Sequence, residues 1–418
     1  MRKRVTLLLI AILAFQSILQ VRSYQTWSIQ TVAKNSELGL NSIALDSNNN
    51  PHIAYSAYEG GYYRNPSYVM YASWNGSEWI IENVTQGGGI IDLALDSNNN
   101  PHIVFNNDGR LMYASLNATD WNMQIVDEGF SASLALDSDD NPHIAYLNGE
   151  HSLKYARWTE TGWHIQTIDS SQLFLNTLSL ELDSNNNPHI LYGYDSPGPK
   201  SRLTVVKYAT HSSSGWNIQA VVSDAAGGGF GNIALNSNGY PHFTYILPRI
   251  NRAFGQTEYT NLNTNLTYVS WNGSGWNTQE VASNISWHNR AGCLALDSND
   301  YPHIVYYNLT SGGYSGVLKY SRWTGTAWDT QTVESISLLN MGSIALDSNG
   351  TPHITYSETP TPTSMYVADI KYATITETTP TPTPTSEFFP TMPLVAASGA
   401  AIVVVGVGLL LYFKKRKH

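Results

Sequence analysis

Short apolar segments separated by dense turn signals recur along most of the chain. One pattern, Ser42–Tyr55, reads Ser-Ile-Ala-Leu-Asp-Ser-Asn-Asn-Asn-Pro-His-Ile-Ala-Tyr, and seven copies of it can be aligned on six aspartates and one asparagine. The copies follow one another about every 50 residues, which is the length of one four-stranded repeat unit. The division of the chain into structural units is therefore predicted from the repeat and not from the total length.

Each repeat unit predicts four strands. Ile43–Leu45 is short and apolar, as expected of a strand buried on both faces, and the Asp-Ser-Asn-Asn-Asn-Pro turn leads to a second strand, His52–Tyr55. Met70–Trp74 is the third strand, and the Asn75–Ser77 turn follows it. The fourth strand begins with Trp, as in Trp163–Ile168, and its alternation fits an outer, half-exposed position.

Both ends of the repeat region carry part of a unit. Trp27–Val32 is a Trp-led fourth strand without a unit of its own, whereas the last unit ends after its third strand, Ile370–Thr374. Because isolated blades would leave sheet edges exposed, we expect the two fragments to complete one blade and close a ring. The sequence predicts an all-β, seven-bladed β-propeller over residues 24–376, with the N-terminal strand closing the last blade.

The N-terminal segment, residues 1–23, has the features of a secretory signal peptide. Met1–Arg4 is positively charged, Val5–Leu19 is apolar, and a cleavage site is expected near Ser23. An uncleaved N-terminal anchor is the alternative interpretation. Either one places the following residues outside the cytoplasm.

The C-terminal segment predicts a stalk and a membrane anchor. Residues 377–393 are rich in Thr and Pro and favour an extended stalk. Residues 394–413 are apolar or small and long enough for a transmembrane helix, and the basic residues 414–418 should remain cytoplasmic. These features predict a single-pass type I membrane protein with the propeller at the cell surface.

Composition and charge exclude several classes. Only 13% of residues are charged, while Tyr 26, Trp 12 and Gly 32 point to aromatic strands and tight turns, which excludes a long charged helical bundle. The single cysteine, Cys293, excludes an internal disulfide and a cysteine-based zinc cluster. Without residues 1–23 and 414–418, 14 basic and 32 acidic residues remain, a formal charge of −18. Such a surface repels phosphate backbones, so we expect no nucleic-acid partner.

Two parts of the chain resemble known families. The Ala-Leu-Asp-Ser-x-x-x-Pro-His hairpins resemble those of propeller repeat families such as the NHL type, and repeats of this kind also occur in sialidase-like surface proteins. This resemblance covers about Gln25 to Thr376 and implies a fold, not an activity. The C-terminal segment resembles the anchors of archaeal surface proteins, in which a Thr/Pro stalk precedes a Pro-Glu-Phe motif. Ser386–Pro390 lacks the Pro before Glu387, so retention of the span and its replacement by a lipid both stay open.

The repeated Asp and His of the hairpins invite a metal-binding interpretation. Asp46–Asn50 has the Asp-x-Asn-x-Asn spacing of a calcium loop, but Pro51 and Ala57 stand where such a loop needs Gly and Glu. We interpret the Asp residues as turn caps, with a looser calcium site at one or two hairpins as the alternative. The seven His lie on a ring too wide for zinc, and each is expected to order an Asp hairpin of its own or a neighbouring blade. We therefore predict no metal and no cofactor. The repeated structural residues are Asp46, His52, Asp96, His102, Asp137, His143, Asp183, His189, Asn236, His242, Asp297, His303, Asp347 and His353.

The Trp residues and the Asn-x-Ser/Thr sequons also recur. Pairs such as Trp74 and Trp79 either stack on sugars or pack between blades, and their regular repetition favours packing. Of eight sequons, those at Asn75, Asn117 and Asn272 share the hairpin between the third and fourth strands, and we take them as candidate glycosylation sites.

Loops of variable length are expected on the face opposite the Asp hairpins. The connection between second and third strands is only Asn106–Arg110 in one unit but about twenty residues, Ile246–Thr264, in another. Arginine side chains bind carboxylates and sulfates through charge-assisted hydrogen bonds. The candidate ligand-binding residues are therefore Arg249, Arg252, Glu258 and Tyr259 in the long loop and Trp287, His288 and Arg290 in the next. Solvated loop charges are the alternative.

These observations favour a non-catalytic binding or adhesion module that takes a glycan or a surface protein through its variable loops. The first alternative is an extracellular sialidase-like glycosidase, with the Arg loops and the Glu258/Tyr259 pair as carboxylate clamp and nucleophile. Against it, the Ser-x-Asp-x-Gly-x-Thr-Trp box is absent and nothing places an acid and a base at glycosidase separation. The second alternative is a purely structural element of the cell envelope.

Overall fold

The computed structural model describes residues 24–58, 67–170, 175–196, 203–225, 229–248, 264–285, 292–309, 315–337, 339–359 and 367–378. Residues Thr26–Thr376 form one compact unit. The predicted signal peptide, membrane span and basic tail lie outside the described residues, as does the stalk after its first two positions, which belong to the last strand. The described residues include no helix that is long and apolar enough to cross a membrane.

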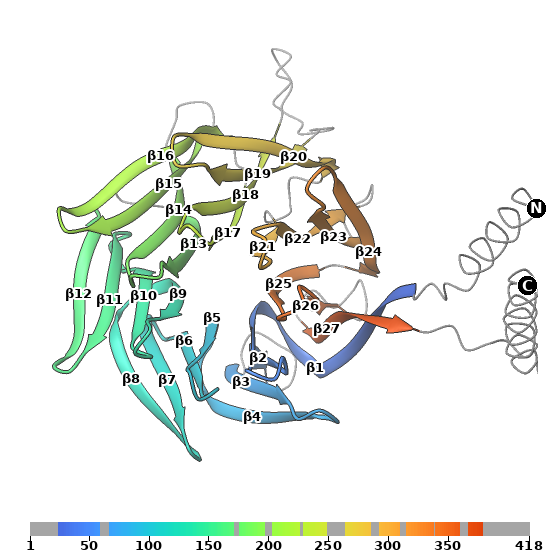
Figure 1. The fold of residues 1–418 in the computed structure, drawn as a ribbon. Helices are drawn as coiled ribbons and strands as arrows, with labels where there is room; N and C mark the ends of the chain where they lie inside the picture. The colour runs from blue at the N-terminus through green and yellow to red at the C-terminus, as the bar shows by residue number, and fades with distance from the viewer. Residues whose placement is uncertain are drawn as a thin grey trace, which may run out of the picture. The chain divides into compact units, whose positions relative to one another are not determined.

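The described residues form β-strands grouped in seven antiparallel four-stranded blades (Figure 1). Blade 1 contains the second half of β1 (Tyr24–Leu45) with β2 (Pro51–Tyr58), β3 (Ser67–Trp74) and β4 (Trp79–Gln86). Blade 2 contains β5 (Gly88–Leu95), β6 (Pro101–Asn107), β7 (Arg110–Asn117) and β8 (Asp120–Glu128). Blade 3 contains β9 (Phe130–Leu136), β10 (Pro142–Leu147), β11 (Leu153–Thr159) and β12 (Gly162–Asp169). Blade 4 contains β13 (Leu175–Leu182), β14 (Pro188–Ser196), β15 (Leu203–Ser212) and β16 (Gly215–Ala225).

The remaining blades follow the same order. Blade 5 contains β17 (Phe230–Leu235), β18 (Pro241–Pro248), β19 (Thr264–Trp271) and β20 (Trp276–Ile285). Blade 6 contains β21 (Cys293–Leu296), β22 (Pro302–Leu309), β23 (Ser315–Trp323) and β24 (Trp328–Ser337). Blade 7 contains β25 (Leu339–Leu346), β26 (Pro352–Glu358) and β27 (Val367–Thr378), and its fourth strand is the first half of β1.

Strand β1 closes the ring because it belongs to two blades. The sheet order β25-β26-β27-β1-β2-β3-β4 places it beside β27 at one end, and Asn41–Leu45 pairs with β2 at the other. Lys371 Nζ donates to Thr31 Oγ1 at 3.1 Å, so the two ends of the unit are joined through side chains as well. The all-β, seven-bladed propeller and its closure by the N-terminal strand are thereby confirmed.

The hydrophobic core is divided into seven clusters, each shared by adjacent blades. The cluster between blades 2 and 3 combines Val104 and Leu111 with Leu134 and Ile144, all buried. Strand two is the most completely buried strand, and Ile53, Ile103, Ile144, Ile190 and Ile304 are each 0% exposed. A buried Ile contributes about 1.5–3 kcal/mol relative to an exposed one. Each blade therefore packs buried side chains against those of its neighbours.

Aromatic pairs repeat the same contact at all seven junctions. The strand-three Tyr of one blade meets the strand-four Trp of the next edge to face, as Tyr113 does with Trp163 at 5.4 Å between ring centroids. Trp27 takes this position against Tyr320 of blade 6, also at 5.4 Å. The remaining pairs are Tyr71–Trp121, Tyr155–Trp216, Tyr208–Trp276, Tyr268–Trp328 and Tyr372–Trp79. These Trp side chains pack between blades, as their repetition predicts.

Candidate functional site

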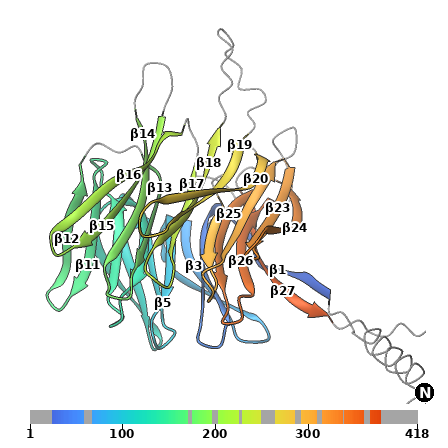
Figure 2. The ribbon, with the colours of Figure 1, turned by 45° about the horizontal axis from the view of Figure 1, so that its top comes forward.

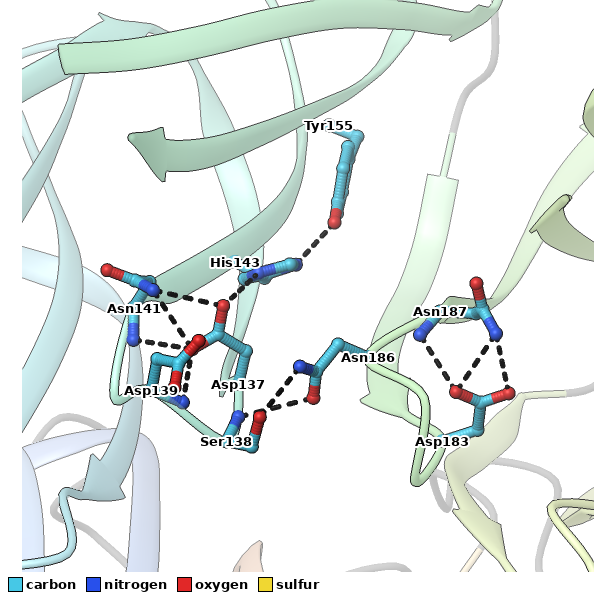
Figure 3. Close-up of polar contacts among 9 residues, drawn as sticks. All are labelled: Asp137, Ser138, Asp139, Asn141, His143, Tyr155, Asp183, Asn186 and Asn187. Atoms are coloured by element: carbon cyan, nitrogen blue, oxygen red, sulfur yellow. Dashed lines mark hydrogen bonds and ion pairs between the residues drawn. The ribbon is translucent and has the colours of Figure 1, made fainter. Parts of the chain in front are cut away.

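The seven hairpins between strands one and two form what we call the hairpin rim, and each is held by its Asp or Asn. In blade 3, Asp137 Oδ1 accepts hydrogen bonds from the N–H groups of Asp139 at 2.9 Å and Asn141 at 2.8 Å (Figure 3). Asp140 between them has φ +64°, a conformation that Asp, Asn and Gly tolerate. Burial acts to raise the pKa of Asp137, but these hydrogen bonds outweigh burial and the pKa is lowered.

A buried His links each hairpin to the third strand of its own blade. His143 contacts the Tyr155 hydroxyl through Nδ1 and Asp137 Oδ2 through Nε2 at 3.3 Å (Figure 3). Burial lowers the pKa of His143, so the neutral ring accepts from Tyr and donates to Asp. The Nδ1–Tyr contact occurs in all seven blades, for His52, His102, His143, His189, His242, His303 and His353. In five blades His Nε2 lies 3.3–3.8 Å from the hairpin Asp.

Blade 5 departs from this pattern because Asn236 replaces the Asp. His242 is 6% exposed, and its Nε2 has no hydrogen-bond partner among the residues that the structure describes. Burial lowers the pKa of His242 to about 4. The Asp and His of the repeat are therefore side by side in most blades, but Asn236 and His242 do not form the same contact.

Neighbouring hairpins are joined by a second set of bonds, which we call the clamp. Ser138 N–H donates to Asn186 Oδ1 at 3.2 Å, and Asn186 Nδ2 donates to Ser138 Oγ at 2.9 Å (Figure 3). Equivalent bonds join Ser47 with Asn99, Ser97 with Asp140, Ser237 with Asp300 and Ser348 with Asn49. The hairpin rim therefore engages its Asp side chains within each hairpin and joins five of the seven pairs of neighbouring hairpins. In the described part of the chain, no three His, Cys, Asp or Glu side chains are grouped so as to hold a metal ion.

The inner strands enclose an axial channel of about 680 Å³. Its wall carries a ring of polar side chains, one from each blade, four positions before the hairpin Asp or Asn: Ser42, Asp92, Ser133, Ser179, Asn232, Cys293 and Ser343. Most of them bond to the next blade. Ser133 Oγ accepts from Leu180 N–H at 3.1 Å, and Asn232 Oδ1 accepts from Leu294 N–H at 2.7 Å. Our reading of the sequence missed this ring, although a polar residue stands at this position in every copy.

Two acidic residues in the channel interrupt the repeat. Asp92 accepts hydrogen bonds from the hydroxyls of Ser42 and Ser133 and from the N–H of Leu134, while its burial raises its pKa. Glu181 stands where the other six copies have Ala. Burial, and secondly the charge of Asp92, raise the pKa of Glu181 to about 7. Among the described lining residues there is no Lys, Arg or His, so the channel favours neutral or cationic groups.

The opposite rim, which we call the variable rim, carries the connections between strands two and three and between successive blades. Figure 2 views the ring from the side, with β14 and β18 ending at this rim. Strands β6 and β7 are joined here by only Asp108 and Gly109, whereas residues 249–263 lie between β18 and β19. The candidate ligand-binding residues Arg249, Arg252, Glu258, Tyr259, Trp287, His288 and Arg290 all lie outside the described residues. Their convergence on one ligand stays a prediction.

The blades are also braced near the variable rim. Asp127 of blade 2 accepts hydrogen bonds from Tyr146 Oη at 2.6 Å and Lys154 Nζ at 2.8 Å, both of blade 3. Asp169 of blade 3 binds Tyr192 and Lys207 of blade 4 in the same way. Such bonds fix the ends of these strands relative to the next blade, and the variable connections begin at these ends.

The candidate glycosylation sites lie on exposed hairpins between strands three and four. Asn75 is exposed, and its Oδ1 accepts from the N–H groups of Ser77 and Glu78, both at 2.9 Å. Asn272 repeats this geometry with Ser274 and Gly275, and Asn117 is also exposed. Attachment of a glycan at these sites stays a prediction.

No family model matches the chain, and no curated protein matches it. Among solved structures, the chain is similar to an ulvan lyase of polysaccharide lyase family PL25 bound to -[GlcA(1-4)Rha3S]-, at 11% identity, over 84% of this chain and 95% of that chain, with a TM-score of 0.56. It is also similar to hydrazine synthase from Kuenenia stuttgartiensis, at 10% identity, over 83% of this chain and 98% of that chain, with a TM-score of 0.52. SapL1 lectin in complex with alpha methyl fucoside matches at 14% identity, over 72% of this chain and 98% of that chain, with a TM-score of 0.46. At such identities the first two similarities, whose TM-scores exceed 0.5, show the fold alone.

Proposed function

We propose that this protein is a membrane-anchored, cell-surface propeller that binds carbohydrate through its variable rim without catalysing a reaction. The observation that carries the proposal is the contrast between the two rims. On the hairpin rim, Asp hairpins of one length bond internally and to one another at most junctions. On the variable rim, the connections between strands two and three range from two residues to fifteen. Rigid scaffolds with variable loops on one side are a common basis for binding surfaces.

The basic residues of the variable connections support an anionic sugar as the ligand. Arg249, Arg252 and Arg290 belong to a propeller that is otherwise strongly acidic. Guanidinium groups bind carboxylates and sulfates through paired hydrogen bonds. The ulvan lyase with the same fold holds a GlcA-Rha3S oligosaccharide, so we rank anionic polysaccharides first among the ligands to test.

A glycan array with residues 24–378 tests this proposal. We expect binding to one or more acidic glycans, and the triple substitution Arg249→Ala, Arg252→Ala, Arg290→Ala should weaken it at least tenfold by removing charge-assisted hydrogen bonds. The melting temperature should change by no more than about 2 °C, since loop charges contribute little to stability. Arg157→Ala, on the exposed face of β11, is the matched control and should bind as the unmodified protein does. Failure of acidic and neutral glycans alike to bind would refute the proposal.

A further inference from the structure

Two of the seven junctions on the hairpin rim lack the clamp side chain. In blades 5 and 7 its position is taken by Gly239, with φ +73°, and Gly350, with φ +77°. The serines that would meet it are Ser184 of blade 4 and Ser298 of blade 6. Within the described residues, neither Ser184 nor Ser298 has the hydrogen-bond partner that its counterparts have.

The clamped junctions show what a Ser in this position binds. Ser97 N–H donates to Asp140 Oδ1 at 2.9 Å, and Ser97 Oγ donates to Asp140 Oδ2 at 2.5 Å. Where the partner is Asn99, Ser47 N–H donates to its Oδ1 and the Nδ2 donates to Ser47 Oγ, both at 2.9 Å. The same serine geometry thus binds a planar carboxylate or carboxamide, whichever the neighbouring blade supplies.

Of the two junctions without a clamp, the described lining of the axial channel reaches only the one between blades 4 and 5. Ser184, Ser237 and Gly239 belong to this lining, whereas Ser298 and Gly350 do not. A Cβ on Gly239 would meet Asp183 Cβ at 3.7 Å, an ordinary van der Waals distance, so no neighbouring atom blocks the place of the missing Cβ. The volume of the channel, about 680 Å³, is in the range of small-molecule sites.

The charges around this opening select against an anionic ligand. Asp183 and Glu181 line the same part of the channel, and the described lining contains no basic side chain. Asp96 holds the position of Asp183 at the junction where Ser97 binds the Asp140 carboxylate, so the acid that is particular to this junction is Glu181. Glu181 would repel a carboxylate ligand with no counter-charge nearby, whereas a neutral carboxamide carries no charge to be repelled. Glu181 and Gly239 are both departures from the repeat, and they occur in the adjoining blades 4 and 5.

We propose that the junction of Ser184 and Gly239 is a binding site for a small ligand that presents a neutral carboxamide group. The ligand oxygen takes the place that Asn99 Oδ1 occupies at its junction, and the ligand N–H group faces Ser184 Oγ. This site lies on the hairpin rim, so its test is independent of ligand binding at the variable rim.

Saturation-transfer NMR on the purified full chain tests the site with two probes, acetamide and N-acetylglucosamine. We expect both to bind, with saturation at the acetyl methyl group, and acetate and glucose at pH 7.5 to bind at least tenfold more weakly. Gly239→Asn supplies the missing clamp from within the chain and should raise the dissociation constant of both probes at least tenfold. Gly350→Asn is the matched control, because it fills the junction outside the channel, and should leave both constants unchanged.

Both variants are expected to fold. Asn occupies this position in three blades with φ 61–65°, and the added clamp should keep the melting temperature at or above that of the unmodified protein. The proposal is overturned if neither probe binds, if Gly239→Asn binds as the unmodified protein does, or if Gly350→Asn loses binding equally. Equal binding of glucose and N-acetylglucosamine would also overturn it, since the sugar ring would then be what is recognised.

Discussion

Closure by β1 predicts an energetic coupling between the two ends of the propeller. Trp27 and Tyr320 meet edge to face, with ring centroids 5.4 Å apart and planes at 75°. Such pairs contribute about 0.5–1.5 kcal/mol beyond the area they bury. Removing a fully buried Trp costs about 3–5 kcal/mol. Because Trp27 is half-buried, we expect Trp27→Ala to lower the free energy of unfolding by about 2 kcal/mol.

A double-mutant cycle isolates the coupling from the other effects of each change. Trp27→Ala, Tyr320→Leu and the double variant of residues 24–378 are unfolded in urea and followed by fluorescence. Tyr320→Leu also removes the bond to His303, but this loss is the same with and without Trp27 and cancels in the cycle. The control cycle uses Tyr71 and Trp121, whose rings lie 5.6 Å apart at 75°. A coupling energy of zero for Trp27 and Tyr320, beside about 1 kcal/mol for the control pair, would refute closure by β1.

Three further predictions concern the buried ionisable groups. Asn236→Asp should give His242 Nε2 the acceptor found in other blades, raising the His242 pKa and adding about 1 kcal/mol of stability at pH 7; a lower melting temperature would contradict this. Burial lowers the pKa of His242 and His303 from 6.5 to about 4. Between these two pH values the unfolded chain therefore binds more protons than the folded protein does. The melting temperature should therefore fall as the pH is lowered from about 6.5 to about 4, and a flat profile would count against the buried neutral histidines. The pH dependence of stability that Glu181 causes has the opposite sign. Its pKa is raised from 4.5 to about 7, so its contribution to stability is lost as the pH rises through that range. Glu181→Gln should therefore be roughly 1–3 kcal/mol more stable than the unmodified protein at pH 8, and equal stabilities would be inconsistent with a buried carboxyl.

The fold was predictable because each local signal recurs seven times. Trp27 is a half-buried residue near the start of the chain, but its resemblance to Trp163 and Trp276 assigns it to a fourth strand without a blade. A single Asp-Ser-Asn-Asn-Asn turn would be weak evidence for a β-hairpin. Because the turns recur at regular spacing, each copy supports the assignment of all the others.

The contacts between blades were harder to predict from sequence. The clamp between Ser138 and Asn186 depends on the curvature of the ring, which brings together residues about one unit apart in the chain. The channel position is Ser, Asp, Asn or Cys in different copies, so it does not stand out as a motif. The variable connections have no repeat to compare, and the candidate residues there rest on composition alone.

The claim that ligands bind at the variable rim is tested most directly by shortening the longest connection. Pro248 pairs with Thr264 across β18 and β19, as Asn107 pairs with Arg110 across β6 and β7. Residues 249–263 can therefore be replaced by Asp-Gly, the turn that this protein already uses between β6 and β7. We predict that the shortened protein melts within about 2 °C of the unmodified one and no longer binds the glycan found in the array. Glycan binding at unchanged affinity by the shortened protein would contradict a ligand site on the variable rim.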